Sequence, residues 1–61
     1  MNRVMRLNNN PNARGFIVRV MEETGRVADM INFKVIASEA HGTKKAAERA
    51  YDRLRLEYGA R

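Results

Sequence analysis

Alternation of apolar and polar residues predicts three β-strands in the first two thirds of the chain. The first covers residues 3–8, and the asparagine-rich run around Pro11 then favours a loop. The second covers residues 15–22, where the alternation is clearest, and the third covers residues 26–37. An antiparallel sheet of all three is expected, because two strands alone are marginal in isolation.

The turn between the second and third strands is predicted at residues 23–26. Gly25 lies in this segment, and glycine readily adopts the positive φ that tight hairpin turns need. Asp29 and Asn32 interrupt the alternation that follows. They predict a bulge or an irregular segment around residues 28–32.

The apolar period changes to 3.6 residues from Thr43 onward, which predicts a helix over residues 43–58. Thr43 is the expected N-cap and Gly59 the expected C-terminal stop. One side of this helix carries Ala46, Ala47, Ala50, Tyr51, Leu54 and Tyr58, whereas Leu56 falls on the other side. The predicted fold class is α+β: a three-stranded antiparallel β-sheet packed on one face by a single C-terminal α-helix, in one domain over residues 1–61.

A single helix covers one face of such a sheet and leaves the other face open, so alternation along each strand predicts both faces. Burying the more apolar side places the following residues under the helix: Met5, Leu7, Phe16, Val18, Val20, Ile31, Phe33 and Val35. The open face is then expected to carry Arg6, Asn8, Ile17, Arg19, Met21, Asn32, Lys34 and Ile36.

Charge is distributed unevenly along the 61 residues. Lys and Arg number 12 against 7 Asp and Glu, the net charge is +5, and no acidic residue precedes Glu22. A basic surplus of this kind is typical of surfaces that bind polyanions.

Several classes of site are excluded by composition. The chain has no cysteine and one histidine, so we expect no disulfide, no metal and no cofactor. No catalytic Ser/His/Asp set or carboxylate pair stands out, and so short a chain leaves little volume for an active site, which argues against an enzyme. No apolar run approaches the roughly 20 residues that span a bilayer, so we expect no membrane partner and a cytoplasmic location.

The predicted open face combines arginine, asparagine and aliphatic side chains, which can read guanine, adenine and the thymine methyl group in the major groove. We therefore expect a DNA-binding domain that docks this face on double-stranded DNA, as a small regulator or accessory factor of phage or mobile-element type. The expected base or sheet-face contacts are Arg6, Asn8, Arg19, Asn32 and Lys34. The expected phosphate contacts are Arg3, Arg14, Arg26, Lys44 and Lys45.

Two alternatives remain open from the sequence. For the two lysines at the helix start, the pattern favours solvated side chains over a phosphate contact, since Glu48 lies one turn after Lys44. The apolar residues Ile17, Met21 and Ile36, with an edge strand near residues 3–7, would also suit a protein-interaction module, such as a small inhibitor of a host protein. Both a monomer and a homodimer are compatible with the pattern.

The segment Thr43–Arg53 resembles the helix of the APETALA2/ethylene-response-factor DNA-binding domain. The resemblance rests on the threonine, the alanines and the sequence Tyr51-Asp52-Arg53 at matching offsets. That family also places three strands before its helix, as do similar modules that bind arm-type sites in some tyrosine recombinases. The resemblance implies the β-β-β-α fold and DNA binding through the sheet. The family's tryptophans are absent here, so its base-reading residues do not transfer.

Overall fold

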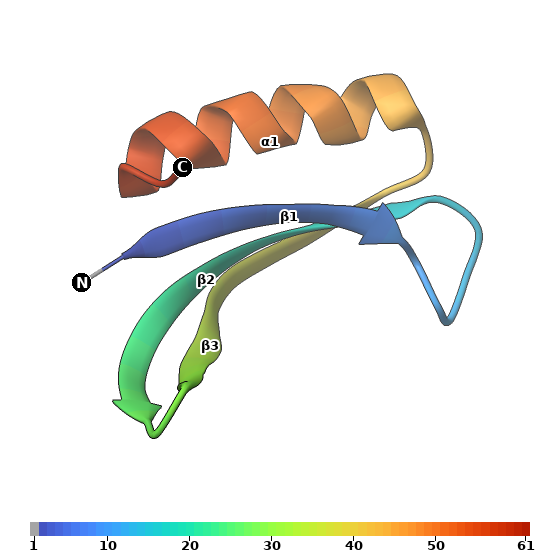
Figure 1. The fold of residues 1–61 in the computed structure, drawn as a ribbon. Coiled ribbons are helices and arrows are strands. Elements are labelled where there is room, and N and C mark those ends of the chain that lie inside the picture. Colours follow the sequence, from blue (N-terminus) through green and yellow to red (C-terminus); the bar gives the residue numbers. More distant parts are fainter. Residues whose placement is uncertain (1) are drawn as a thin grey trace.

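The computed structural model describes residues 2–61, which fold into three strands and one helix in the order β-β-β-α (Figure 1). The strands are β1 (Arg3–Asn9), β2 (Phe16–Val27) and β3 (Met30–His41), and the helix is α1 (Lys44–Tyr58). The strands form one antiparallel sheet in the order β1-β2-β3. This arrangement confirms the predicted fold class.

The helix begins and ends where the sequence predicts. The Thr43 hydroxyl accepts a hydrogen bond from the backbone N–H of Ala46 at 3.2 Å. Gly59 closes the helix in the left-handed conformation, with φ 62°. Leu56, the one apolar residue on the outer side, is 74% exposed.

The core lies between α1 and one face of the sheet. Of residues 2–61, seven hydrophobic residues are buried, and three of them are alanines: Met5, Val18, Val20, Ala47, Ala50, Leu54 and Ala60. Small side chains on the helix bring it close to the sheet but bury little apolar area each. The core is therefore compact and small even for a chain of this length.

The second hairpin is longer than the sequence predicts, and its turn lies elsewhere. Residues 23–26 continue β2, and the chain reverses at Ala28 and Asp29. The positive φ that the turn requires, 55°, is adopted by Ala28 and not by Gly25. The predicted irregular segment at 28–32 is also wrong, because the register shifts fall between Val20 and Met21 and between Glu23 and Gly25.

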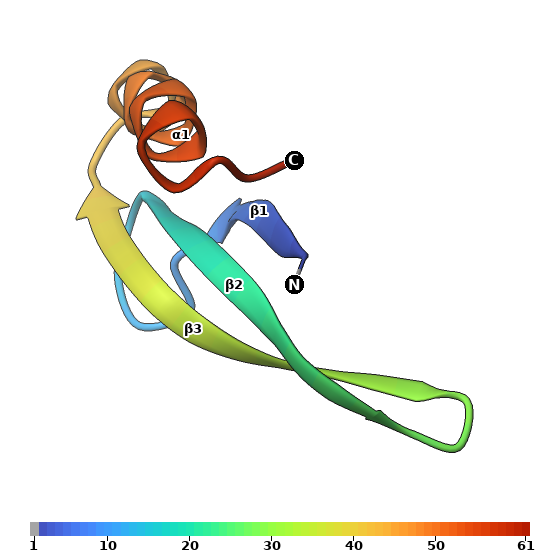
Figure 2. The same cartoon turned by 90° about the vertical axis from the view of Figure 1, so that its left-hand side faces the viewer.

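Half of this hairpin projects beyond the rest of the molecule. The ladder between β1 and β2 stops at Arg3 and Glu22, and one further hydrogen bond runs from the Glu23 N–H to the Asn2 carbonyl at 2.8 Å. Beyond Glu23 the strand β2 has β3 as its one neighbour among the described residues. Figure 2 shows the resulting twisted two-stranded arm extending past β1 and away from α1. We call residues 23–33 the arm. Its length makes the molecule elongated, with principal extents of 38, 25 and 14 Å.

Candidate functional site

The face of the sheet away from α1 is defined by the strand register, since directly opposed residues of antiparallel strands share a face. Met5 and Val20 are opposed and buried under the helix, so their neighbours along each strand lie on the open side. We call that side the open face. Across its three strands it carries Asn8, Ile17 and Ala40 in one row, Arg6, Arg19 and Ser38 in the next, and Val4, Met21 and Val35 in a third.

Two arginines lie side by side at the centre of the open face. Arg6 on β1 is directly opposed to Arg19 on β2, as the sequence predicts. Opposed like charges destabilise a sheet unless they are neutralised. In residues 2–61 neither guanidinium takes part in a salt bridge, and Arg6 has one hydrogen bond, from Nη1 to the carbonyl of Met5 at 3.3 Å. This arginine pair is an uncompensated cationic site.

The prediction that Lys34 and Asn32 share this face is wrong. Lys34 is opposed to Glu22 and Asn32 to Gly25, which places both on the opposite side of the ribbon from Arg19. The cause is the register shift at Val20 and Met21, which leaves one extra residue in β3 and reverses the alternation beyond it.

The same shift exchanges the buried and exposed apolar residues of β3. Ile36 was expected on the open face, but it packs against the core. Ile31, Phe33 and Val35 were expected to be buried, but they are 42%, 37% and 50% exposed. Three successive apolar residues, Val35-Ile36-Ala37, break the alternation here, and that run is the one signal of the bulge in the sequence.

Arg3 serves the fold instead of the open face. Its Nε donates to Glu22 at 2.9 Å, its Nη1 donates to the carbonyl of Tyr58 at 3.0 Å, and its guanidinium lies 5.8 Å from the centre of the Tyr58 ring. These contacts join β1, β2 and the end of α1. We therefore leave Arg3 out of any phosphate contact.

The remaining predicted phosphate contacts are dispersed. Arg14 is exposed in the loop that joins β1 to β2, two residues before Phe16. Arg26 lies on the arm, where its Nε donates to Glu23 at 3.3 Å. Lys44 and Lys45 are exposed in the first turn of α1, in the layer on the other side of the sheet. The structure therefore does not bring the lysines together with Arg6 and Arg19.

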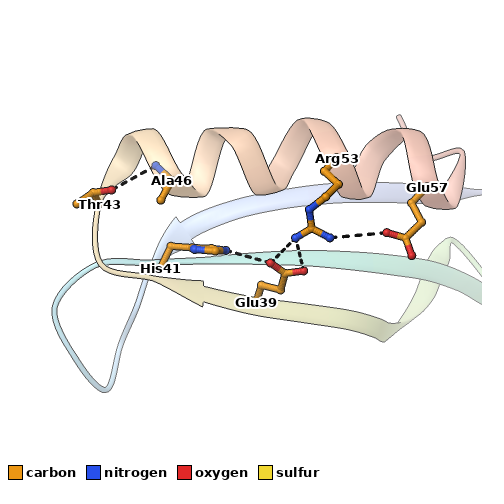
Figure 3. Close-up of polar contacts among 6 residues, drawn as sticks. All are labelled: Glu39, His41, Thr43, Ala46, Arg53 and Glu57. Atoms are coloured by element: carbon orange, nitrogen blue, oxygen red, sulfur yellow. Dashed lines mark hydrogen bonds and ion pairs between the residues drawn. The ribbon is translucent and has the colours of Figure 1, made fainter.

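A polar network that the sequence did not reveal joins the end of β3 to α1. Figure 3 shows Glu39 between the side chains of His41 and Arg53. The His41 Nε2 is 3.1 Å from Glu39, and Arg53 Nη1 is 3.8 Å from Glu57 one turn further along. The hydrogen bond from Arg53, and secondarily that from His41, lowers the pKa of the Glu39 carboxyl. This network joins β3 to α1 on the helix side of the sheet and is part of the fold.

A shallow hollow of about 350 Å³ lies between β1 and α1 and is lined by Leu7, Glu48, Tyr51 and Asp52. No helix within residues 2–61 is both long and apolar enough to cross a membrane.

Comparison of the chain with family models, with curated proteins and with solved structures gives no match. The functional argument therefore rests on the residues of the open face.

Proposed function

We propose that this protein is a non-catalytic module that binds double-stranded DNA with its open face. The observation that carries the proposal is the opposed, uncompensated pair Arg6 and Arg19 at the centre of an otherwise uncovered sheet. Two adjacent positive charges without acidic partners weaken the isolated fold and are offset when an anion binds between or beside them.

The chemistry around the arginine pair suits the major groove. Arginine binds the O6 and N7 atoms of guanine with two hydrogen bonds, and a short β-ribbon fits the width of this groove. Ser38 supplies a further polar group in the same row and Asn8 in the adjacent row, and Ile17 offers an aliphatic surface for a thymine methyl group. The likeness of residues 43–53 to the helix of the APETALA2 domain agrees with this use of the sheet.

The backbone contacts of the proposed complex are fewer than the sequence suggests. Arg14 in the loop between β1 and β2 and Arg26 on the arm are the phosphate contacts that we retain. On random-sequence DNA, where Arg6 and Arg19 would meet phosphates in place of guanine, about four phosphates would be neutralised, and the slope of log K against log salt would be about −3 to −4. A role as a small regulator or accessory factor of a phage or mobile element remains part of this proposal.

Fluorescence anisotropy with a random-sequence DNA duplex tests the proposal directly. At about 50 mM salt we expect micromolar binding, and at about 200 mM salt a loss of roughly a hundredfold, because phosphate contacts release counterions. Arg19→Ala is expected to weaken binding by about tenfold, since it removes one of two central charges.

Arg49→Ala is the matched control for this experiment. Arg49 is an exposed arginine of α1, in the layer on the far side of the sheet, so its removal lowers the net charge equally without touching the open face. We expect its affinity to stay within about twofold of the unmodified protein. Equal weakening by Arg19→Ala and Arg49→Ala, or no binding at low salt, would refute docking through the open face.

A further inference from the structure

The two edges of the sheet differ in how their backbone is covered. On β1, Arg61 donates its N–H to the carbonyl of Arg3, and its own carbonyl accepts from the N–H of Met5, both at 3.0 Å. Arg61 therefore pairs in the manner of a strand with the first part of this edge, at Arg3 and Met5. In residues 2–61 no segment pairs with the outer edge of β3. The edge strand expected near residues 3–7 is thus covered at Arg3 and Met5, and β3 is the free edge.

The backbone groups that β3 leaves free can be assigned. Thr24 on β2 donates its hydroxyl to the carbonyl of Asn32 at 3.2 Å, so the backbone of Asn32 faces β2. The direction of N–H and C=O groups alternates along a strand. The groups of Ile31, Phe33 and Val35 consequently point away from β2, toward the free edge.

The side chains of the same three residues are apolar and exposed, and they lie on the open face. Asn32 and Lys34 lie between them. Residues 31–35 therefore alternate between apolar and polar, and the pattern is the same in either chain direction from Phe33. A strand that pairs antiparallel with a copy of itself needs this symmetry of pattern. Most natural edge strands avoid exposed apolar side chains along a free edge, because such an edge invites pairing with another chain.

We propose that the free edge of β3 is a self-association site, where a second copy of this chain adds its own β3 in antiparallel orientation. Phe33 of one copy lies opposite Phe33 of the other, and Ile31 lies opposite Val35. All three positions have outward backbone groups, so they form hydrogen-bonded pairs across the interface. The two sheets become one six-stranded sheet with a twofold axis at Phe33.

Charge and strand geometry both fit this register. Lys34 of each copy meets Asn32 of the other, so no like charges are opposed, whereas a shift of the axis to Lys34 would oppose the two lysines. The new ladder is bounded by the turn at Ala28 and Asp29 and by the extra residue Ile36 in β3. The segment left between them has the usual length of a strand.

The small core supplies a further reason for a second copy. With seven buried hydrophobic residues among those the structure describes, the isolated fold has little apolar burial to offset the entropy of ordering the arm. Chains of this size often obtain additional burial through oligomerisation. Pairing through β3 would cover Ile31, Phe33 and Val35, which are otherwise exposed on the arm and at its base.

Self-association would also extend the proposed DNA-binding surface, a consequence that rests on the proposed function. A twofold axis perpendicular to the sheet keeps the open faces of both copies on the same side. The assembly then presents two pairs of Arg6 and Arg19, which would read two half-sites of a palindromic DNA sequence. The self-association itself does not depend on DNA.

Sedimentation analysis of the full chain without DNA, from about 1 to about 500 µM, tests the proposal. We expect a monomer–dimer equilibrium, with dimer predominant at the highest concentration. Phe33→Lys should shift dissociation to at least a hundredfold higher concentration, because it places two charges opposite each other at the axis. Leu56→Lys, at an exposed apolar residue on α1 and away from β3, should leave the equilibrium unchanged.

Hydrogen exchange distinguishes the proposed edge from any other interface. The Phe33 N–H should exchange more slowly in the concentrated, dimeric protein than in the dilute, monomeric protein, because it becomes a ladder donor on pairing. A wild-type protein that stays monomeric at about 500 µM, a dimer unaffected by Phe33→Lys, or an unprotected Phe33 N–H in the dimer would each overturn the proposal. DNA binding is measured separately, so failure of the self-association leaves the proposed function standing.

Discussion

Gly15 holds a backbone conformation that other residues adopt with strain, at the point where the first loop enters β2. Its φ is 110°, and a Cβ added there would collide with the carbonyl oxygen of His41 on β3. Both the dihedral angle and the contact oppose substitution. We expect Gly15→Ala to lower the free energy of unfolding by about 2 kcal/mol or more, measured by urea denaturation.

Gly42→Ala is the control for this prediction. Gly42 follows β3, has no positive φ, and an added Cβ would meet no atom within 4 Å. Its substitution should change stability by less than about 1 kcal/mol. Equal stability of the two variants would show that the loop of residues 10–15 adjusts to a side chain at no cost.

Local signals determined how far single residues could be predicted. Thr43 and Gly59 were predicted as helix ends because their chemistry is specific to those positions. The turn residue Ala28 could not be predicted, because alanine at positive φ contradicts its own preference. Glycine at position 25 pointed to a nearer turn, but tertiary pairing of the long hairpin took precedence.

At the scale of elements, the main difference between prediction and structure is the phase of β3. The existence of the strand followed from its apolar residues, and its two faces followed from alternation. One extra residue at Ile36 reversed the faces of everything from Val35 toward the turn. Arg6, Asn8 and Arg19 were placed correctly because β1 and β2 pair without a shift, whereas Asn32 and Lys34 lie beyond it.

The contact between β3 and α1 depends on the ionisation of Glu39. Arg53 holds the pKa of this carboxyl below its ordinary value, about 4.3 in unstructured chains, and His41 adds a smaller effect. A depressed pKa means that the carboxylate stabilises the fold above that ordinary value and that this stabilisation is lost as pH falls through the folded-state pKa. Glu39→Gln should therefore destabilise the protein at about pH 7, and this effect should shrink as the carboxylate of the unmodified protein is protonated, so urea unfolding at about pH 7 and about pH 3 should give a smaller difference at the lower pH.

Glu48→Gln provides the comparison for Glu39→Gln. Glu48 is exposed on α1 and takes part in none of the salt bridges of residues 2–61. It controls for the loss of one negative charge in a basic protein. A stability difference between Glu39→Gln and the unmodified protein that is the same at both pH values would contradict a role for the ionised carboxylate.

On the scale of the whole molecule, the order of strands and helix was predictable because each has its own apolar period and the connections are short. The projecting arm was not predictable from the sequence, since its length depends on where the turn forms. Because the arm has no core beneath it and the arginine pair lies on the sheet body, the open face has two regions of different chemistry. The sheet body presents charge, and the arm presents apolar side chains and a free edge.

The strand-like contact of Arg61 with β1 has a consequence for the size of any assembly. A sheet whose β1 edge is already paired at Arg3 and Met5 can add one neighbour at the β3 edge and then stops. A sheet with two open edges can continue to add copies into a filament. Arg61→Pro removes the N–H that bonds to the Arg3 carbonyl, so it should convert a self-limiting pair into polymers that light scattering or thioflavin fluorescence detects. Arg61→Ala keeps the backbone donor and should not polymerise. If both variants form polymers, or if neither does, the two backbone hydrogen bonds of Arg61 do not determine where assembly stops.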